Sequence, residues 1–240
     1  QDGTVVSSTD NGHEPTSMTR ASHWLGGSAF ADQYFEGAIK TVQIWSRALG
    51  ADEVASLHAL DGACLATPTP APTPAPTWWA QPDAADLQLW LRADELGCAV
   101  GDAVASWSDL SSNGYVAAQA NASHAPECAG ARASLNGHAA VRFGGEGRWT
   151  SLTLGADPIY ASGSGLTVFA VVANVRDDSQ YPWLFDQGSW GSSGVGMYVR
   201  AAGAYGASPF VYAYSPLDAN GTSSSGNPAT LGNATAHVVT

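Results

Sequence analysis

Three asparagines of this 240-residue chain stand two residues before a serine or threonine, the spacing that N-glycosylation requires. Such triplets also arise by chance in chains rich in serine and threonine, so a single one is weak evidence. The candidate acceptors are Asn121, Asn220 and Asn233. Together they predict a chain that carries sugars.

A second candidate for sugar attachment is the segment 67–77, in which every second residue is proline and only threonine and alanine lie between. Proline lacks an amide hydrogen and fixes φ, which excludes a helix and an inner strand. We expect a polyproline II rod roughly 34 Å long within a linker, 67–84. The rod resembles the hydroxyproline-rich, O-glycosylated segments of algal and plant walls and flagellar hairs. That resemblance implies hydroxylation or O-glycosylation at Thr67, Pro68, Thr69, Pro70, Pro72, Thr73, Pro74, Pro76 and Thr77.

The charge of the chain is acidic, with 21 Asp and Glu against nine Lys and Arg and a net charge of −12. This charge disfavours nucleic acid and anionic membrane surfaces as partners. No run of about eighteen apolar residues occurs, so we expect no membrane insertion. The sequons, the rod and the cysteines favour an extracellular or cell-surface glycoprotein, and the alternative is a secreted bacterial protein without glycans.

Short apolar runs separated by Gly, Ser and Asn predict a β-sandwich of many strands. The run 165–173 is apolar on both faces and is expected to be central, whereas 51–60 is expected to be a short helix. Alternation within 39–45 predicts one face made of Ile39, Thr41, Gln43 and Trp45 and an opposite face made of Lys40, Val42 and Ile44. Further strands are expected within 87–94, 136–145, 181–188, 194–200 and 210–214.

The run 35–58 carries the pattern FxGxIxxVxIWxRALxxxExxxLH. It resembles the closing hairpin and last helix of the laminin-G-like, concanavalin-A-like jelly-roll family. The matching residues are Phe35, Gly37, Ile39, Val42, Ile44, Trp45, Arg47, Ala48, Leu49, Glu53 and Leu57. Residues 85–240 resemble the other end of that family, through an opening strand at 87–94, a WxDxSxNG turn at 107–114 and NGxxAVRFxG at 136–145. The resemblance implies an all-β jelly roll.

The resemblance also implies that the sandwich is split across the chain ends. Residues 1–66 would be its C-terminal third and 85–240 its N-terminal two-thirds, and 236–240 would pair with the first residues. Three arrangements explain this order: one repeat of a tandem array, halves of two different domains, or a circular permutant. In an array, each sandwich is completed by a neighbouring unit, which removes long exposed strand edges.

Glucanases of this fold use paired carboxylates on one strand, and none of the six glutamates has an acid at the required spacing. The sequence therefore predicts a protein that is not an enzyme. Sugar binding, a common role in the family, would use Trp183, Trp190 or Tyr205, with Tyr212 and Tyr214 as further aromatics near loops. Calcium is common in related domains, and the weak candidate ligands are Asp177, Asp178, Asp186 and Asp218; no other cofactor is expected.

The fold that the resemblance implies would bring the loops of Cys98 and Cys128 together, which predicts a disulfide between them. Cys64 is left to pair with Cys98 or with a cysteine elsewhere. We therefore expect an extracellular structural glycoprotein, the repeat unit of a filament or coat whose partners are identical copies or neighbouring repeats. The alternative is a carbohydrate-binding adhesin module.

Overall fold

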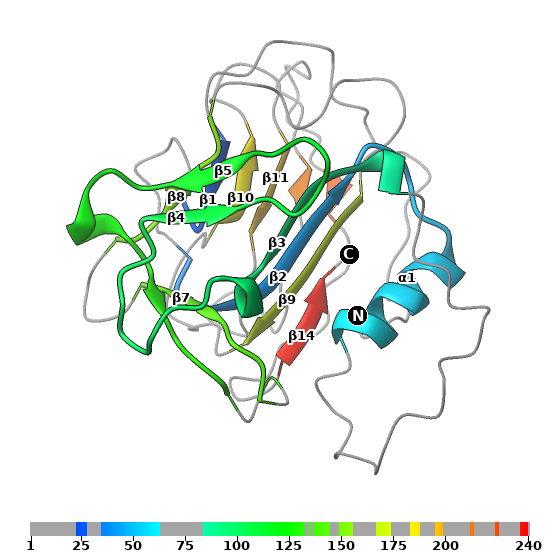
Figure 1. Ribbon diagram of the computed structural model, residues 1–240. Helices are drawn as coiled ribbons and strands as arrows, with labels where there is room; N and C mark the ends of the chain where they lie inside the picture. The colour runs from blue at the N-terminus through cyan, green and yellow to red at the C-terminus, as the bar shows by residue number, and fades with distance from the viewer. Residues whose placement is uncertain are drawn as a thin grey trace, which may run out of the picture.

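The computed structural model describes residues 23–27, 35–62, 84–132, 135, 137–144, 149–155, 167–173, 183–187, 195–198, 212–213, 224–225 and 236–239. Most of the regular structure in these residues is β-strand, arranged in antiparallel sheets (Figure 1). The short α1 (Ala51–Leu57) continues into one π-helical turn, η1 (His58–Gly62), which confirms the predicted helix. Single 3-10 turns occupy η2 (Ala84–Asp86), η3 (Ala93–Glu95) and η4 (Ala122–His124).

The first sheet has the strand order β11–β10–β1–β8–β5–β4, and all neighbours in it are antiparallel. We call it sheet A. Its strands are β1 (His23–Leu25), β4 (Ser106–Ser108), β5 (Val116–Ala118), β8 (Leu152–Thr153), β10 (Trp183–Gln187) and β11 (Val195–Tyr198). The short β12 (Tyr212–Ala213) and β13 (Ser224–Ser225) form a separate pair.

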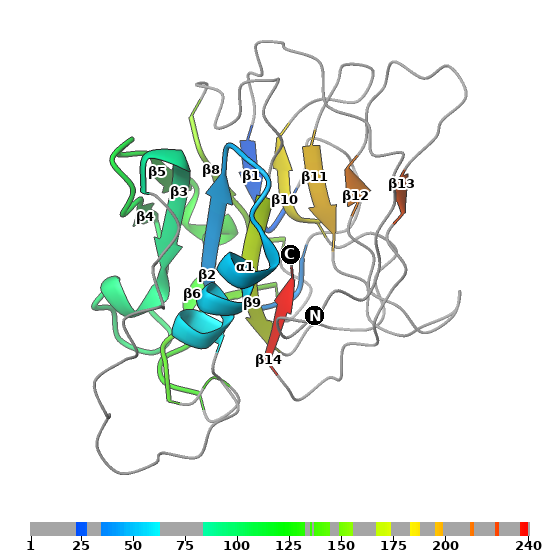
Figure 2. The ribbon, with the colours of Figure 1, turned by 90° about the vertical axis from the view of Figure 1, so that its right-hand side faces the viewer.

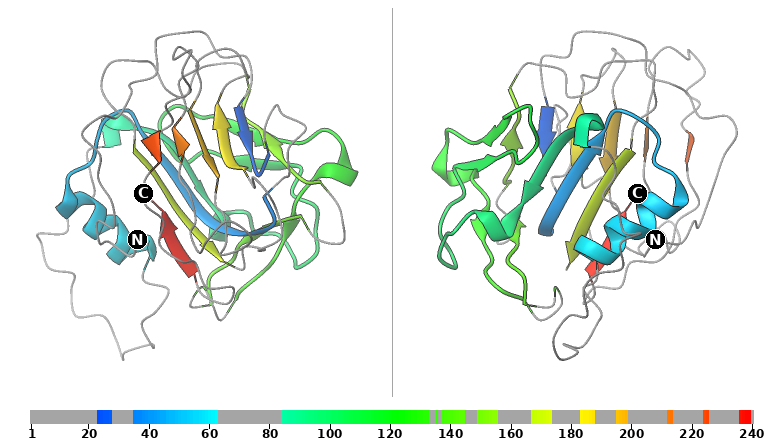
Figure 3. Two further views of the ribbon diagram at one scale, coloured as in Figure 1. Left: turned by 180° about the vertical axis from the view of Figure 1, so that it is seen from behind. Right: turned by 45° about the vertical axis from the view of Figure 1, so that its right-hand side comes forward.

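The second sheet, sheet B, has the order β14–β9–β2–β7–β6, and β3 also pairs with β2. Its strands are β2 (Gly37–Trp45), β3 (Leu87–Arg92), β6 (Glu127–Cys128), β7 (Val141–Phe143), β9 (Thr167–Ala173) and β14 (Ala236–Val239). The views in Figure 3 show β2, β9 and β14 side by side. The central position predicted for the run 165–173 is confirmed, because β9 is flanked by β14 and β2.

An apolar core fills the space between the two sheets, and both sheets contribute to it. Trp107 of β4 is 1 % exposed there, and its indole Nε1 donates a hydrogen bond to the carbonyl oxygen of Arg92 at 3.2 Å. Phe143 and Phe185 are fully buried from the opposite sheets. Burial of such large side chains is the main source of the free energy that holds the sheets together.

The outer face of sheet B has an apolar layer of its own. Leu57 of α1 packs there with Trp45 and Phe169, so α1 covers this face (Figure 2). The all-β sandwich predicted from the sequence is thus confirmed, with one short helix lying on one sheet.

A β-bulge in β2 corrects the predicted faces of that strand. Ile39 pairs with Val172 of β9, whereas Thr41 pairs with the adjacent Val171, so Lys40 is an extra residue in the ladder. One extra residue reverses the alternation of faces beyond it. Ile39 therefore joins the core between the sheets, on the same side as the valine and isoleucine at 42 and 44, and the predicted face containing Ile39 and Thr41 was wrong.

The WxDxSxNG motif forms the hairpin between β4 and β5. Both carboxylate oxygens of Asp109 accept hydrogen bonds: Oδ1 from the amides of Trp90 and Ser111, each at 2.8 Å, and Oδ2 from the Ser111 hydroxyl at 2.6 Å and the Tyr115 amide at 3.2 Å. The side-chain amide of Asn113 donates to carbonyl oxygens of β3. The motif therefore holds this hairpin against β3, which is a structural role.

Candidate functional site

Residues 23–62 supply an inner strand to each sheet. β1 lies between β10 and β8, and β2 lies between β9 on one edge and β7 followed by β3 on the other. All five partner strands come from residues after 84. Within the described part of the chain, β1 and β2 do not pair with each other. We call residues 23–62 the donor segment and residues 84–239 the acceptor.

Removing the donor segment would divide sheet A into two parts and sheet B into three, all with unpaired edges. All nine residues of β2 are buried. Unpaired backbone groups in a buried strand edge are unfavourable, and such edges invite pairing with another strand. The acceptor therefore needs a donor segment to complete its fold. Of the arrangements that the sequence left open, the array predicted completion by a neighbouring unit and the permutant predicted completion within one chain; in the structure the two segments of one chain pair with each other.

The donor segment is fastened to the acceptor by polar contacts just after β2. Arg47 Nε donates to Asp86 Oδ2 at 2.7 Å, and the Ser46 amide donates to the Asp86 carbonyl oxygen at 2.9 Å. The Thr167 hydroxyl donates to the Arg47 carbonyl oxygen and accepts from the Leu49 amide, both at 3.0 Å. We call Ser46, Arg47, Asp86 and Thr167 the polar lock. It joins the end of β2 to the start of β3 and the start of β9.

The Arg47 guanidinium also binds Glu53 within the donor segment, through Nη1 at 2.7 Å and Nη2 at 2.6 Å. This bidentate bond, followed by the Gly50 amide, lowers the pKa of Glu53 to about 2. Hydrogen bonds from Arg47 to Glu53 and then to Asp86 raise the pKa of Arg47. Arg47 is thus held by two acids, one on each side of the boundary between donor and acceptor.

The lowered pKa of Glu53 predicts an acid-dependent contribution to stability. Glu53 in the unfolded chain takes up a proton near its ordinary pKa of about 4.3, whereas folded Glu53 does so near 2. Its contribution is therefore full above about pH 4.3 and is lost as the pH falls toward 2. We expect Glu53→Gln to lower the urea midpoint at pH 6 and to differ little from the parent chain near pH 2. Glu95→Gln is the control, because Glu95 is an exposed acid away from Arg47. A urea midpoint that Glu53→Gln lowers equally at both pH values would contradict this account.

The outer face of sheet A is a second candidate site. Leu25 and Phe185 point into the core, so the neighbouring Trp24 and Asp186 lie on the opposite face, where they are cross-strand partners. Thr153 of β8 is the partner of Trp24 on its other side. Trp24 is half-buried, and Asp186 is fully buried. We call Trp24, Thr153 and Asp186 the outer row. The half-buried indole of Trp24 beside the half-buried Thr153 is the kind of surface on which a sugar ring can stack, whereas the fully buried carboxylate of Asp186 offers such a ring no contact.

The aromatic residues predicted to contact sugar are placed differently. Trp183 in β10 is only 7 % exposed, so its ring offers little surface. Trp190 and Tyr205 lie outside the described residues, as does Tyr214. Trp24 was missed because it stands in a three-residue strand, although its position directly before a core leucine indicates that it faces outward.

Of the predicted calcium ligands, the described residues include Asp186 alone, and among these described residues no three His, Cys, Asp or Glu side chains form a group that could hold a metal ion. Asp186 lies in the outer row, and Asp177, Asp178 and Asp218 lie outside the described residues. Several described acids have structural partners: Asp94 contacts His138, and Glu127 pairs with Arg142. No described strand carries two carboxylates on one face, the arrangement that glycoside hydrolysis uses.

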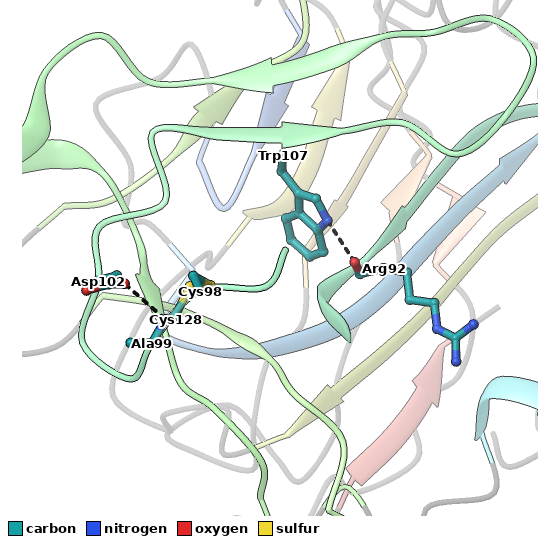
Figure 4. Close-up of a disulfide and its surroundings, with 6 residues drawn as sticks. All are labelled: Arg92, Cys98, Ala99, Asp102, Trp107 and Cys128. Atoms are coloured by element: carbon teal, nitrogen blue, oxygen red, sulfur yellow. Dashed lines mark hydrogen bonds between the residues drawn. A yellow bond between two sulfur atoms is a disulfide. The ribbon is translucent and has the colours of Figure 1, made fainter. Parts of the chain in front are cut away.

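Cys98 and Cys128 form a disulfide, as predicted, with their Cα atoms 6.2 Å apart (Figure 4). The loop that begins at Cys98 is also bonded to β6 through its backbone. The amide of Gly101 donates to the Cys128 carbonyl oxygen, and the Cys128 amide donates to the carbonyl oxygen of Asp102, both at 2.9 Å. The disulfide therefore lies wholly within the acceptor. Cys64 lies outside the described residues.

Of the predicted sugar acceptors, Asn121 is described, and it is exposed at the start of η4. Its Oδ1 accepts hydrogen bonds from the Ser123 hydroxyl at 2.7 Å and the Ser123 amide at 3.1 Å. The sequon serine thus contacts the asparagine side chain directly. Asn220, Asn233 and the rod 67–77 lie outside the described residues. Among the helices that are described, none has the length and apolar character needed to cross a bilayer.

Comparison with known families places the first part of the chain beside a lectin-like superfamily. Residues 1–55 match the laminin G model of the concanavalin A-like lectin/glucanases superfamily. No curated protein and no solved structure matches the chain. The match and the antiparallel sheets together support an all-β concanavalin-A-like fold and an extracellular or carbohydrate-binding module. Domains of this kind are typically extracellular and without catalytic activity, although the superfamily includes glucanases.

Proposed function

We propose that the protein is a structural glycoprotein of an extracellular filament or surface coat. Its units join through complementary parts of the jelly roll, and the Pro/Thr rods connect them along the chain. A donor segment of one copy completes the acceptor of the next, and glycans on the rods and on exposed sequons cover the assembly. The partners are identical copies or neighbouring repeats, and no catalysis is involved.

One observation carries this proposal: β1 and β2 each occupy an inner position in a sheet and pair only with strands beyond residue 84 within the described part of the chain. These partners belong to the same chain, so the assembly requires that donor segments exchange between copies. Every contact that completes the sandwich is available to the donor segment of a second copy. Whether an acceptor binds its own donor segment or that of a second copy depends on the effective concentration of its own segment, which the linker 67–84 sets. A stiff, glycosylated rod holds its ends apart, which lowers that concentration and favours exchange between copies.

The test is refolding of the glycosylated chain at several concentrations, followed by size-exclusion chromatography with light scattering. We expect oligomers whose molar masses are multiples of the mass of one glycosylated chain, 24.6 kDa of polypeptide plus its glycans. Larger oligomers should form at higher refolding concentrations. Digestion with an endoglycosidase that removes N-glycans should shift the mass of the peptide containing Asn121. A monomer at every refolding concentration would contradict the assembly.

The outer row favours a second candidate function, a carbohydrate-binding adhesin module. The outer face of sheet B is covered by α1, whereas the neighbours of the outer row in sheet A are small. Thr153 pairs with Ala118, and Ala118 pairs with the exposed Ser106. Small side chains beside an indole leave room for a sugar ring.

Replacing Trp24 with alanine tests the adhesin function. We expect Trp24→Ala to lower binding on a glycan array by at least tenfold, because stacking on the indole would be lost. Trp149→Ala is the matched control, since Trp149 is 67 % exposed in a loop and belongs to no sheet. Absence of binding by the parent chain to every glycan would exclude this function.

A further inference from the structure

We propose that the polar lock selects donor segments that carry Arg47, so that during exchange an acceptor takes the donor segment of a second copy of this chain rather than a similar segment without that arginine. This inference rests on the proposed exchange between copies. It assigns the selectivity to one contact, Arg47 with Asp86, rather than to the whole boundary between donor and acceptor.

The rest of that boundary discriminates less by charge. β2 is joined to β9, β7 and β3 by backbone ladders with one bulge at Lys40, and one buried side-chain bond crosses to β3, from the Thr41 hydroxyl to the Leu91 carbonyl oxygen at 2.8 Å. The side chains of β2 that enter the core are aliphatic, such as Val42 and Ile44. Apolar cores tolerate substitution of similar volume at a cost usually below about 1.5 kcal/mol. Another jelly-roll strand of similar pattern would therefore fit the same position.

The hydrogen bonds of Arg47 in the polar lock require particular side chains in particular positions, unlike the backbone bonds of the strand ladders. Arg47 points one nitrogen at Asp86 of the acceptor while its other two nitrogens bind Glu53 of the donor. The fork geometry of a guanidinium fixes the direction of all three bonds at once. The side chains of Arg47, Glu53 and Asp86 are 28 %, 31 % and 40 % exposed, so water screens the pair in part but does not separate it.

Backbone contacts hold the lock in place. The Ser46 amide and hydroxyl both bond to the Asp86 carbonyl oxygen, at 2.9 and 3.3 Å, and Thr167 bonds to the backbone on the other side of Arg47. These bonds bring any donor to the position at which residue 47 meets residue 86. A donor with an acid at position 47 would then set two carboxylates against each other, which is a repulsive element against the wrong partner.

The acidity of the chain strengthens this selection. With 21 acids against nine basic residues, an approaching segment meets mostly negative charge. An arginine on the donor facing an aspartate on the acceptor is attractive against that background. Asp86 also lies two residues after the linker, so the lock sits near the start of the acceptor.

A charge exchange tests the inference in the full chain. The donor variant is Arg47→Glu with Glu53→Arg, which preserves the ion pair inside the donor segment. The acceptor variant is Asp86→Arg. Exchange is read with one added cysteine per chain beside the Cys98–Cys128 disulfide, Ala38→Cys on the donor side and Ala173→Cys on the acceptor side, because Ala38 and Ala173 are cross-strand partners. All chains carry Cys64→Ser, and they are refolded together under oxidising conditions.

We expect disulfide-linked pairs when both chains have the native lock residues. The yield should fall about fivefold when the donor variant meets the native acceptor, or the native donor meets the acceptor variant. It should recover when the two variants meet each other. Ala38→Cys mixed with Val172→Cys is the control, because Val172 pairs with Ile39 and not with Ala38.

The outcomes separate the two proposals. Linked pairs that form equally well in matched and mismatched mixtures would overturn the selectivity assigned to the lock, while leaving the assembly intact. No linked pairs in any mixture, including the native one, would overturn the exchange between copies and the inference with it.

Discussion

Val42→Pro is expected to abolish the native fold of an isolated chain. Val42 is fully buried and pairs with Leu91 of β3 on one edge and Ala170 of β9 on the other. Proline has no amide hydrogen to donate and does not fit a central strand, and the substitution also removes core volume. The combined effect should exceed about 3 kcal/mol, a large part of the stability of an ordinary domain.

The measurement is the near-ultraviolet circular dichroism of the tryptophan-rich core, with urea unfolding to compare stabilities. Val42→Ala is the matched control, because it removes core volume but keeps the amide hydrogen. It should lower the free energy of unfolding by about 2 kcal/mol and keep the native spectrum. A native spectrum for Val42→Pro would show that β2 is not an inner strand.

Removing the disulfide is expected to cause the next largest loss of stability against unfolding. Cys98 and Cys128 are 30 residues apart, and closing a loop of that length stabilises by about 3 to 4 kcal/mol in a loop-entropy estimate. Cys98→Ala combined with Cys128→Ala should lower the urea midpoint accordingly. The same variant should still accept a donor segment, because the disulfide lies outside the boundary between donor and acceptor.

Cys64→Ser is the control for the loss of a thiol, and it should leave the midpoint nearly unchanged. Reduction of the parent chain should reproduce the destabilisation of the double variant. An unchanged midpoint in both the double variant and the reduced chain would contradict the assignment of this disulfide as a stabilising link.

Local pattern was enough to predict several elements. The opening strand at 87–94, the buried strand at 165–173 and the helix after position 50 follow from apolar periodicity and from turn residues. The pairing of Cys98 with Cys128 followed from the resemblance, because the fold that it implies brings the two loops together. These features depend on short-range signals or on a shared topology.

Other features depend on contacts that no local pattern encodes. The bulge at Lys40 arises where the edge of β2 changes partner from β7 to β3, so strict alternation assigned Ile39 to the wrong face. Trp24 was not recognised as a surface aromatic, because the position of a three-residue strand is set by its neighbours. The contact between Arg47 and Asp86 spans 39 residues and the linker, and only the paired strands bring the two together.

The central claim is that a donor segment can complete the acceptor of another copy, and co-refolding of two defective chains tests it most directly. One chain carries Val42→Pro and keeps an intact acceptor. The other carries Val171→Pro in β9, where Val171 pairs with Thr41 and Val238, and keeps an intact donor segment. Each chain alone should remain unfolded. Mixed in equal amounts, they should form a complex with about half of the native near-ultraviolet signal, since one of its two sandwiches is complete. A mixture that stays as unfolded as its components at every concentration would contradict the claim.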